Sequence, residues 1–174
     1  MTTSILITGV SGAGKSTVCL ALNERGYHSY DMEAIDGLFT MIDTETGEPF
    51  ADFDPNDLES IEKSEWICDT DQLQAHLQEQ TAPIAFYGGI ASNQEELRPL
   101  FDDVVLLTVS PAVLRDRLST RTNNRFGRDP EVQEQILGWK DDWEAAVLEE
   151  GAIAIDADRG LSVVVTAILD AVGR

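Results

Sequence analysis

The chain has few of the residues that build metal centres, disulfide frameworks or nucleic-acid surfaces. Its 174 residues include two cysteines, two histidines and three lysines, and 32 acidic residues outnumber 12 lysines and arginines. Cys19 and Cys68 lack metal-ligand spacing, both histidines are isolated, and we expect no disulfide. The formal net charge of -20 disfavours binding to nucleic acid or to an anionic membrane.

Long hydrophobic runs are also missing from the sequence. No segment has the length and apolarity of a membrane span, and the N-terminus lacks the basic and then apolar pattern of a signal peptide. We therefore expect a cytoplasmic protein that is a monomer or a homodimer. The length suits one domain over residues 1–174 with a sizeable core.

The most specific motif is GVSGAGKS at residues 9–16, which fits the phosphate-binding pattern G-x-x-x-x-G-K-[ST] in full. An apolar run precedes it and a helix-compatible stretch follows, so backbone N–H groups and a helix N-terminus can face a polyphosphate. We expect Lys15 to reach the β- and γ-phosphates and the Ser16 hydroxyl to bind Mg²⁺. The predicted nucleotide-binding set is Gly9, Gly12, Ala13, Gly14, Lys15, Ser16 and Thr17.

Strands and helices alternate along the chain, which predicts an α/β fold with a parallel sheet covered on both faces. Ligands then bind at the carboxyl ends of the strands. Strands are expected at 4–8, 27–30, 83–87, 103–109 and 152–155. Helices are expected at 15–25, 69–79, 111–120, 130–150 and 161–172. In the acidic segment 36–68, the sequence TETG at 44–47 predicts a hairpin between 39–43 and 49–53.

Two acidic residues, Asp31 and Glu33, follow the second expected strand. One can hold Mg²⁺ and the other can orient or deprotonate an attacking hydroxyl group. We favour Asp31 as the catalytic residue, as a magnesium ligand and as a substrate contact, with Glu33 as a second substrate contact. The alternative is that Asp31 only caps a helix. The third and fourth strands end without an acid, which argues against a motor or transporter-type ATPase.

Other candidate substrate contacts lie beyond these acids. Gly88 and Gly89 allow close backbone approach by a ligand, or else form a tight turn. Asn93 extends the same loop. Trp66 either closes over a ring-bearing substrate or belongs to the core.

Arginines are concentrated in one short segment of this acidic chain. Arg115, Arg117, Arg121, Arg125 and Arg128 fall within fourteen residues, opposed there only by Asp116. Contact with phosphate explains this cluster better than a solvated helix face does. The segment 122–129 suits a lid that closes on the nucleotide, with Arg121 and Arg128 acting on the transferred phosphoryl group and Arg125 contacting the substrate.

Together, the phosphate loop, the acids after the second strand, Gly88-Gly89 and the arginine-rich helix and loop resemble the small P-loop kinases of the adenylate, shikimate and gluconate kinase group. Residues 121–128 look like the short lid of nucleoside-kinase-like members. The resemblance implies a three-layer αβα fold, a five-stranded parallel sheet in the order 2-3-1-4-5, and ATP with Mg²⁺. It also implies that Arg117 lies near the adenine and that residues 156–159 border the base. We expect a substrate-binding insertion at about 36–68, whose hairpin-like part at 39–53 is unlike the compact nucleotide-monophosphate-binding domain of the group.

The resemblance further implies transfer of the γ-phosphoryl group to a nucleoside, nucleotide or other hydroxylated metabolite. A nucleotide-binding protein or NTPase switch without a small-molecule acceptor is the alternative. A guanine-specific switch would need an N-K-x-D motif, which the sequence lacks. Intact Lys15, Ser16 and Asp31 argue against loss of activity.

Overall fold

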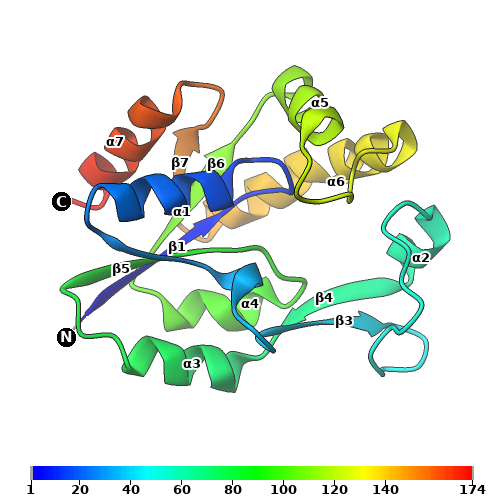
Figure 1. Cartoon of the computed structure of the whole chain (residues 1–174), viewed down its shortest axis with the longest axis horizontal. Coiled ribbons are helices and arrows are strands. Elements are labelled where there is room, and N and C mark those ends of the chain that lie inside the picture. Colours follow the sequence, from blue (N-terminus) through cyan, green and yellow to red (C-terminus); the bar gives the residue numbers. More distant parts are fainter. Residues whose placement is uncertain (1, 174) are drawn as a thin grey trace.

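A five-stranded parallel sheet forms the centre of the molecule, for which a computed structural model describes residues 2–173 (Figure 1). The sheet consists of β2 (His28–Asp31), β5 (Ile84–Gly88), β1 (Thr3–Thr8), β6 (Asp103–Thr108) and β7 (Ile153–Asp156), in that spatial order. Counted along the chain among themselves, these strands stand in the predicted order 2-3-1-4-5. The phosphate loop therefore leaves the central strand.

Seven α-helices connect and cover the described strands: α1 (Lys15–Glu24), α2 (Leu58–Glu62), α3 (Thr70–Gln78), α4 (Gln94–Leu97), α5 (Pro111–Thr120), α6 (Pro130–Glu149) and α7 (Leu161–Ala171). Two short 3₁₀ helices, η1 (Met32–Ala34) and η2 (Arg98–Leu100), follow β2 and α4. The predicted cap of α6 is confirmed, since Asp129 accepts a hydrogen bond from the Glu131 N–H and Pro130 occupies the first turn. Within residues 2–173, no helix is long and apolar enough to span a bilayer.

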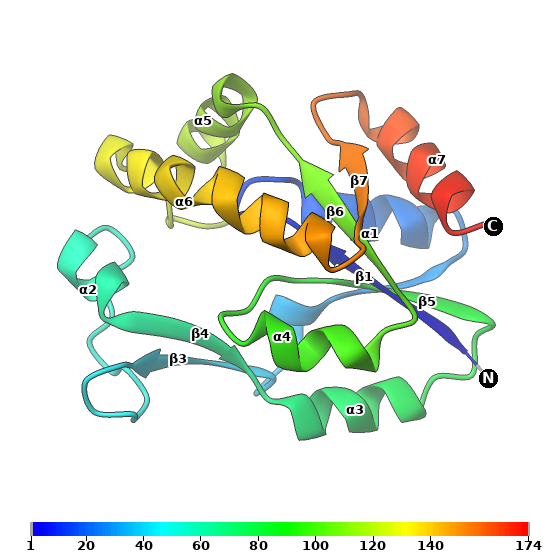
Figure 2. The same cartoon turned by 180° about the vertical axis from the view of Figure 1, so that it is seen from behind.

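Alternation along the strands divides the core between the two faces of the sheet. Ile5 and Ile7 of β1 point into a cluster with side chains of α1, α5, α6 and α7, whereas Leu6 points into a second cluster with Leu73 of α3 and Leu97 of α4. In the view from behind, α6 and α4 lie in front of the sheet (Figure 2). The two hydrophobic clusters, one on each face of the sheet, hold the carboxyl ends of the strands in fixed positions.

A two-stranded antiparallel ribbon projects from the sheet and differs from the predicted hairpin. Its first strand, β3 (Phe39–Asp43), is where the sequence places it, but its partner is β4 (Ser64–Cys68) and not residues 49–53. Pro49 makes only an isolated bridge to Ile42, because proline offers no N–H to continue a ladder. The turn after Asp43 does form, with Gly47 N–H bonded to the Asp43 carbonyl.

Candidate active site

The phosphate loop joins β1 to α1 and is shaped by glycine. Gly12 has φ +90°, and a Cβ atom added there would lie 2.9 Å from Leu114 Cδ1, so the loop packs too closely on α5 for a larger residue. Lys15 at the start of α1 is only 8% exposed. Its Nζ donates to the carbonyl oxygens of Gly9 (2.8 Å) and Val10 (3.3 Å).

Burial lowers the pKa of Lys15, and the attraction of Glu33 and Asp31 offsets this only in part. An ammonium group with two carbonyl partners and two carboxylates near it is poorly satisfied compared with one that binds phosphate oxygens. The lysine is thus held where a polyphosphate would exchange its carbonyl contacts for charge-assisted ones.

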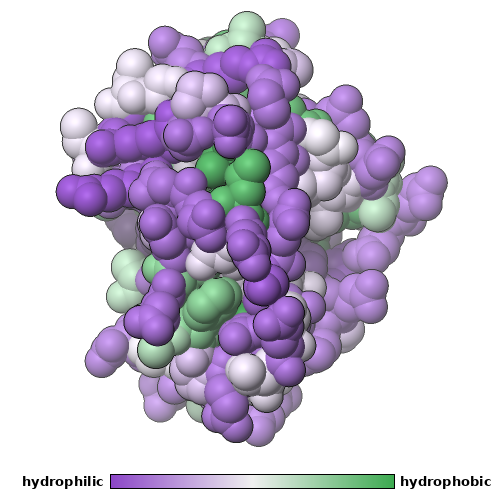
Figure 3. All heavy atoms as spheres, turned by 90° about the vertical axis from the view of Figure 1, so that its right-hand side faces the viewer, coloured by the Kyte–Doolittle hydropathy of each residue, from purple (hydrophilic) through white to green (hydrophobic). Residues whose placement is uncertain are grey.

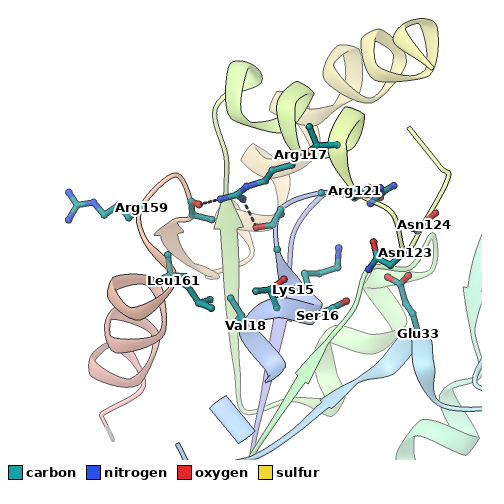
Figure 4. A pocket seen from close by; sticks show the side chains of 18 residues that line it. Lys15, Ser16, Val18, Glu33, Arg117, Arg121, Asn123, Asn124, Arg159 and Leu161 are labelled. Atoms are coloured by element: carbon teal, nitrogen blue, oxygen red, sulfur yellow. Dashed lines mark hydrogen bonds between the residues drawn. The ribbon is translucent and has the colours of Figure 1, made fainter. Parts of the chain in front are cut away.

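A pocket of about 400 Å³ opens over this loop (Figure 4). Its walls come from the phosphate loop, the end of α5, the α5–α6 loop, the β7–α7 loop and the segment after β2. Among the lining residues are Ser11, Gly12, Ala13, Gly14, Lys15, Ser16, Thr17, Glu33, Arg117, Arg121, Asn123, Asn124, Arg159, Leu161 and Val164. The volume and this polar lining suit a bound nucleotide.

The two acids after β2 have different surroundings. The Asp31 carboxylate accepts a hydrogen bond from the Glu33 N–H (3.1 Å) and caps η1, whereas the Glu33 side chain lines the pocket and points toward Lys15 in Figure 4. Although Glu33 is exposed to solvent, the surrounding walls displace enough water to raise its pKa, and Asp31 adds to the rise. Lys15, a backbone hydrogen bond from Ile90 and Arg121 oppose that rise.

The donor set for a divalent ion is small. Among residues 2–173, no three His, Cys, Asp or Glu side chains converge on a metal-sized site. Ser16, in the first turn of α1, and Asp31, at the end of the neighbouring β2, offer one hydroxyl and one carboxylate. That set fits Mg²⁺, which takes one or two protein oxygens and fills the rest of its octahedron with phosphate oxygens and water.

Four of the five clustered arginines have no carboxylate partner among the described residues. Only Arg115 forms an ion pair, with Glu134 (2.8 Å). Arg117 instead donates to the carbonyl oxygens of Ala13 (3.1 Å) and Ala157 (2.6 Å), which ties the phosphate loop to the β7–α7 loop. The remaining three, Arg121, Arg125 and Arg128, keep their charge available to an anion.

Arg121 crosses from the end of α5 to the phosphate loop. Both terminal nitrogens donate to Ser11 Oγ (3.1 Å each), and one also contacts the Phe126 carbonyl oxygen. Burial lowers the pKa of Arg121, against the attraction of Glu33. Arg128 donates to the Arg121 carbonyl oxygen (2.7 Å), so the Arg128 side chain is held against the backbone at the end of α5.

Gly127 fixes one end of the α5–α6 loop. It is buried, its φ is +79°, and an added Cβ atom would lie 3.0 Å from Leu118 Cδ2 and 3.3 Å from Ile136 Cδ1. Residues 122–125 beside it are exposed. The part of the predicted lid that is free of packing is therefore shorter than 122–129.

The other predicted substrate contacts lie outside the pocket lining. Gly88 and Gly89 are buried where the chain packs: a Cβ atom at Gly88 would lie 2.6 Å from Cys19 Sγ, and one at Gly89 would lie 3.2 Å from Met32. Asn93 holds the ribbon, because its amide accepts from Cys68 N–H (3.0 Å) and donates to the Cys68 carbonyl oxygen (3.0 Å). Trp66 is half-buried on β4 and stacks on Phe39.

Several pocket residues were not predicted. Ser11 lies inside the loop motif but at a position that the motif leaves open, and Asn123 and Asn124 carry no motif at all. Leu161 and Val164 show the i, i+3 spacing of an apolar helix face directly after the 156–159 loop, a signal that could have placed them in the pocket wall.

The comparisons with known proteins agree with this architecture. A family model described as an AAA domain matches residues 5–138, which is most of the chain. Among curated proteins, no sequence matches.

Several solved structures share the fold. A gluconokinase from Sinorhizobium meliloti 1021 is 23% identical, covers 99% of this chain and 92% of its own, and has a TM-score of 0.56. A deoxyadenosine kinase from M. mycoides with bound dATP is 16% identical (98% and 99% covered, TM-score 0.60). A shikimate kinase from Bacteroides thetaiotaomicron is also 16% identical (99% of both chains, TM-score 0.58).

Proposed function

Because the chain belongs to the AAA domain family and folds like the small P-loop kinases, we propose that it is an ATP-dependent phosphotransferase acting on a hydroxyl group of a small molecule. One observation carries the proposal. A single pocket brings together a complete phosphate loop, two arginines without carboxylate partners and the carboxylate of Glu33.

The nucleotide is bound by the phosphate loop, by residues at the ends of α5 and α7 that line the pocket, and by the ligands of Mg²⁺. Backbone N–H groups of residues 12–17 and Lys15 hold the phosphates, in place of the carbonyl contacts that Lys15 makes now. Arg117, Leu161 and Val164 form the far end of the pocket and contact the base. Ser16 and Asp31 hold Mg²⁺, which neutralises charge on the β- and γ-phosphates when it is bound.

The acceptor hydroxyl is placed by Glu33. The oxygen of the acceptor hydroxyl forms a bond to the γ-phosphorus while the bond from that phosphorus to the ADP oxygen breaks. The hydroxyl proton passes to the Glu33 carboxylate. The sequence favoured Asp31 for this role. We prefer Glu33 as the proton acceptor, because it lines the pocket and has a raised pKa. Asp31 instead caps η1 and is assigned to Mg²⁺.

Arg121 and Arg128 act on the transferred group. The Arg121 side chain already contacts Ser11 of the phosphate loop, and the Arg128 side chain is held nearby by its hydrogen bond to the Arg121 backbone carbonyl. A guanidinium at this point stabilises charge on the equatorial oxygens during transfer. Closure of residues 122–125 over the nucleotide would exclude water and so favour the acceptor over hydrolysis.

The ends of the strands beside the phosphate loop give no support to a nucleotide-hydrolysing motor. The described strands β5 and β6, which flank β1, end in Gly88 and Thr108, so neither supplies the acid that a nucleotide-hydrolysing motor places beside its phosphate loop.

The experiment has two stages. Melting temperatures with ATP or GTP, with and without Mg²⁺, should rise most with Mg²⁺ and ATP. A screen of hydroxylated metabolites, followed by ADP release, should then reveal an acceptor that stimulates turnover. A protein that binds no nucleotide, or releases ADP at the same rate with every candidate, would contradict the proposal.

A further inference from the structure

The acceptor side of the molecule is almost free of positive charge. Between Arg25 and Arg115 the chain has nineteen acidic residues and only two that are lysine or arginine. Lys63 is paired with Glu59 (2.8 Å) and Glu45 (3.5 Å), and Arg98 donates to the Glu150 carbonyl oxygen (3.4 Å). Lys63 is therefore neutralised by its own carboxylates, and Arg98 lies before β6 and against Glu150, which precedes β7, at the amino ends of the strands and away from the site at their carboxyl ends.

An aromatic face of the ribbon borders the same region. The β3–β4 register pairs Met41 with Trp66 and Phe39 with Cys68, so alternation puts Phe39, Met41 and Trp66 on one face. The rings of Phe39 and Trp66 are stacked, with centroids 5.1 Å apart and an interplanar angle of 16°. Each of these three side chains is only half-buried, which leaves apolar surface for a ligand.

The aromatic face of the ribbon begins close to Glu33, the proposed proton acceptor. Phe39 shares a small recess with Met32, Gly89 and Ile90. Glu33 directly follows Met32, and its carboxylate takes a backbone hydrogen bond from Ile90. Figure 3, which faces the end where the ribbon projects, shows small apolar patches enclosed by hydrophilic surface.

The ribbon is held in place before any ligand binds. Trp66 N–H donates to Ser92 Oγ (2.9 Å), and Ser92 N–H donates to the Trp66 carbonyl oxygen (2.8 Å). Asn93 repeats the arrangement two residues later at Cys68. A stacking surface fixed in this way costs little ordering entropy when a ring binds on it.

On the basis of the proposed function, we propose that the acceptor carries a planar ring and no negative charge. Its ring lies on the Phe39–Trp66 face and its hydroxyl group reaches Glu33. An acidic acceptor would meet Asp31, Glu33 and Asp36, because the cations that act on Glu33, Lys15 and Arg121, are taken up by the nucleotide phosphates. Ring stacking and the absence of like-charge repulsion together select uncharged, nucleoside-like alcohols over nucleotides and sugar acids.

The test compares matched pairs of ligands on the wild-type protein. The ATP site is first filled with Mg²⁺ and a non-hydrolysable ATP analogue, so that no nucleoside enters it. Calorimetry then measures the binding of nucleosides and pyridoxine, each beside its 5′-phosphate, with gluconate as an open-chain acid and shikimate as an acid that contains a ring. At least one uncharged compound should bind about tenfold or more tightly than its phosphate, and the ratio should shrink as salt is added.

Variants assign the effect to the aromatic face. Trp66→Ala should weaken binding of that uncharged compound about tenfold, and Trp66→Phe should restore most of it. Trp139→Ala, on α6 and 40% exposed, is the matched control and should change nothing. Unchanged affinity for the ATP analogue shows that each variant is folded.

The outcomes separate this inference from the proposed function. Tighter binding or phosphorylation of a phosphate or sugar acid, for example through Arg125, would overturn the inference and leave the kinase proposal intact. Failure of every uncharged ring compound to bind would also overturn it. Selective binding of an uncharged compound without any phosphoryl transfer would support the inference and defeat the kinase proposal.

Discussion

At the residue scale, the site depends on charges that lack full partners. Lys15 is buried against two carbonyl oxygens, Glu33 has a raised pKa in a pocket that also holds Lys15 and Arg121, and Arg121 has a lowered pKa. The two cations, Lys15 and Arg121, are costly in an empty site and become satisfied when the nucleotide phosphates bind. Unusual pKa values in one pocket are typical of catalytic sites.

The first prediction concerns Lys15. Lys15→Ala should lower phosphoryl transfer on the order of a hundredfold or more, because it removes charge that stabilises the transition state. The apo melting temperature should change little, since the lysine contributes a poorly satisfied buried charge. Lys63→Ala, at an exposed ion pair on the ribbon side, is the control and should retain wild-type turnover. Near-wild-type turnover of Lys15→Ala would remove the kinase assignment.

The second prediction concerns the pH profile. Because Glu33 accepts a proton only when ionised, turnover should rise with pH as Glu33 deprotonates, and its raised pKa places this limb above the usual glutamate value of about 4.3. Glu33→Gln should lower turnover on the order of a hundredfold and abolish the limb. Asp31→Asn should instead raise the Mg²⁺ concentration needed for half-maximal rate. A limb that survives in Glu33→Gln but vanishes in Asp31→Asn would assign the base to Asp31.

At the element scale, the α5–α6 loop is the part expected to move. Arg128→Ala should lower turnover roughly ten- to a thousandfold, because an arginine on the transferred phosphoryl group is lost. The apo melting temperature should stay nearly constant, since Arg128 is exposed and its bond is to a loop carbonyl. Arg128→Lys should recover only part of the loss. Arg115→Ala, which breaks an exposed ion pair between α5 and α6, is the control.

The fourth prediction concerns the α5–α6 loop, in which Gly127 is packed and residues 122–125 are expected to move. Gly127→Ala should destabilise the protein by about 1–3 kcal/mol, because it forces a side chain into a left-handed conformation against Leu118 and Ile136. Chemical denaturation measures this cost. Hydrogen exchange should be fast at residues 122–125 without ligand and slow with Mg²⁺ and ATP. A slow-exchanging loop in both states would contradict closure.

The positions of most helices and strands could be predicted from the sequence, but the pairing of β3 could not. The loop motif, the Asp129-Pro130 helix start and the five apolar strands are local signals, and each element lies within a few residues of its expected place. The partner of β3 was mispredicted, because a nearby turn suggested residues 49–53 and pairing with Ser64–Cys68 depends on distant contacts at Ser92 and Asn93. For the same reason, the sequence could not show that Gly88 packs on Cys19 or that Glu33, and not Asp31, lines the pocket.

At the scale of the whole molecule, charge is divided between two halves of one site. The net charge is -20, yet arginines gather around the nucleotide pocket while the β2–β5 side is acidic. This division suits a triphosphate on one side and an acceptor without negative charge on the other. The parallel sheet brings the two halves together, because β1 and β2 end at the same edge.

The most direct test of the central claim is to follow the γ-phosphate itself. ATP labelled at that position is incubated with the protein, Mg²⁺ and the best acceptor from the metabolite screen, beside Lys15→Ala. We expect label on the acceptor in a one-to-one ratio with ADP, and none with the variant. Label recovered only as inorganic phosphate, at a rate that the acceptor does not change, would show that the protein hydrolyses ATP and is not a kinase.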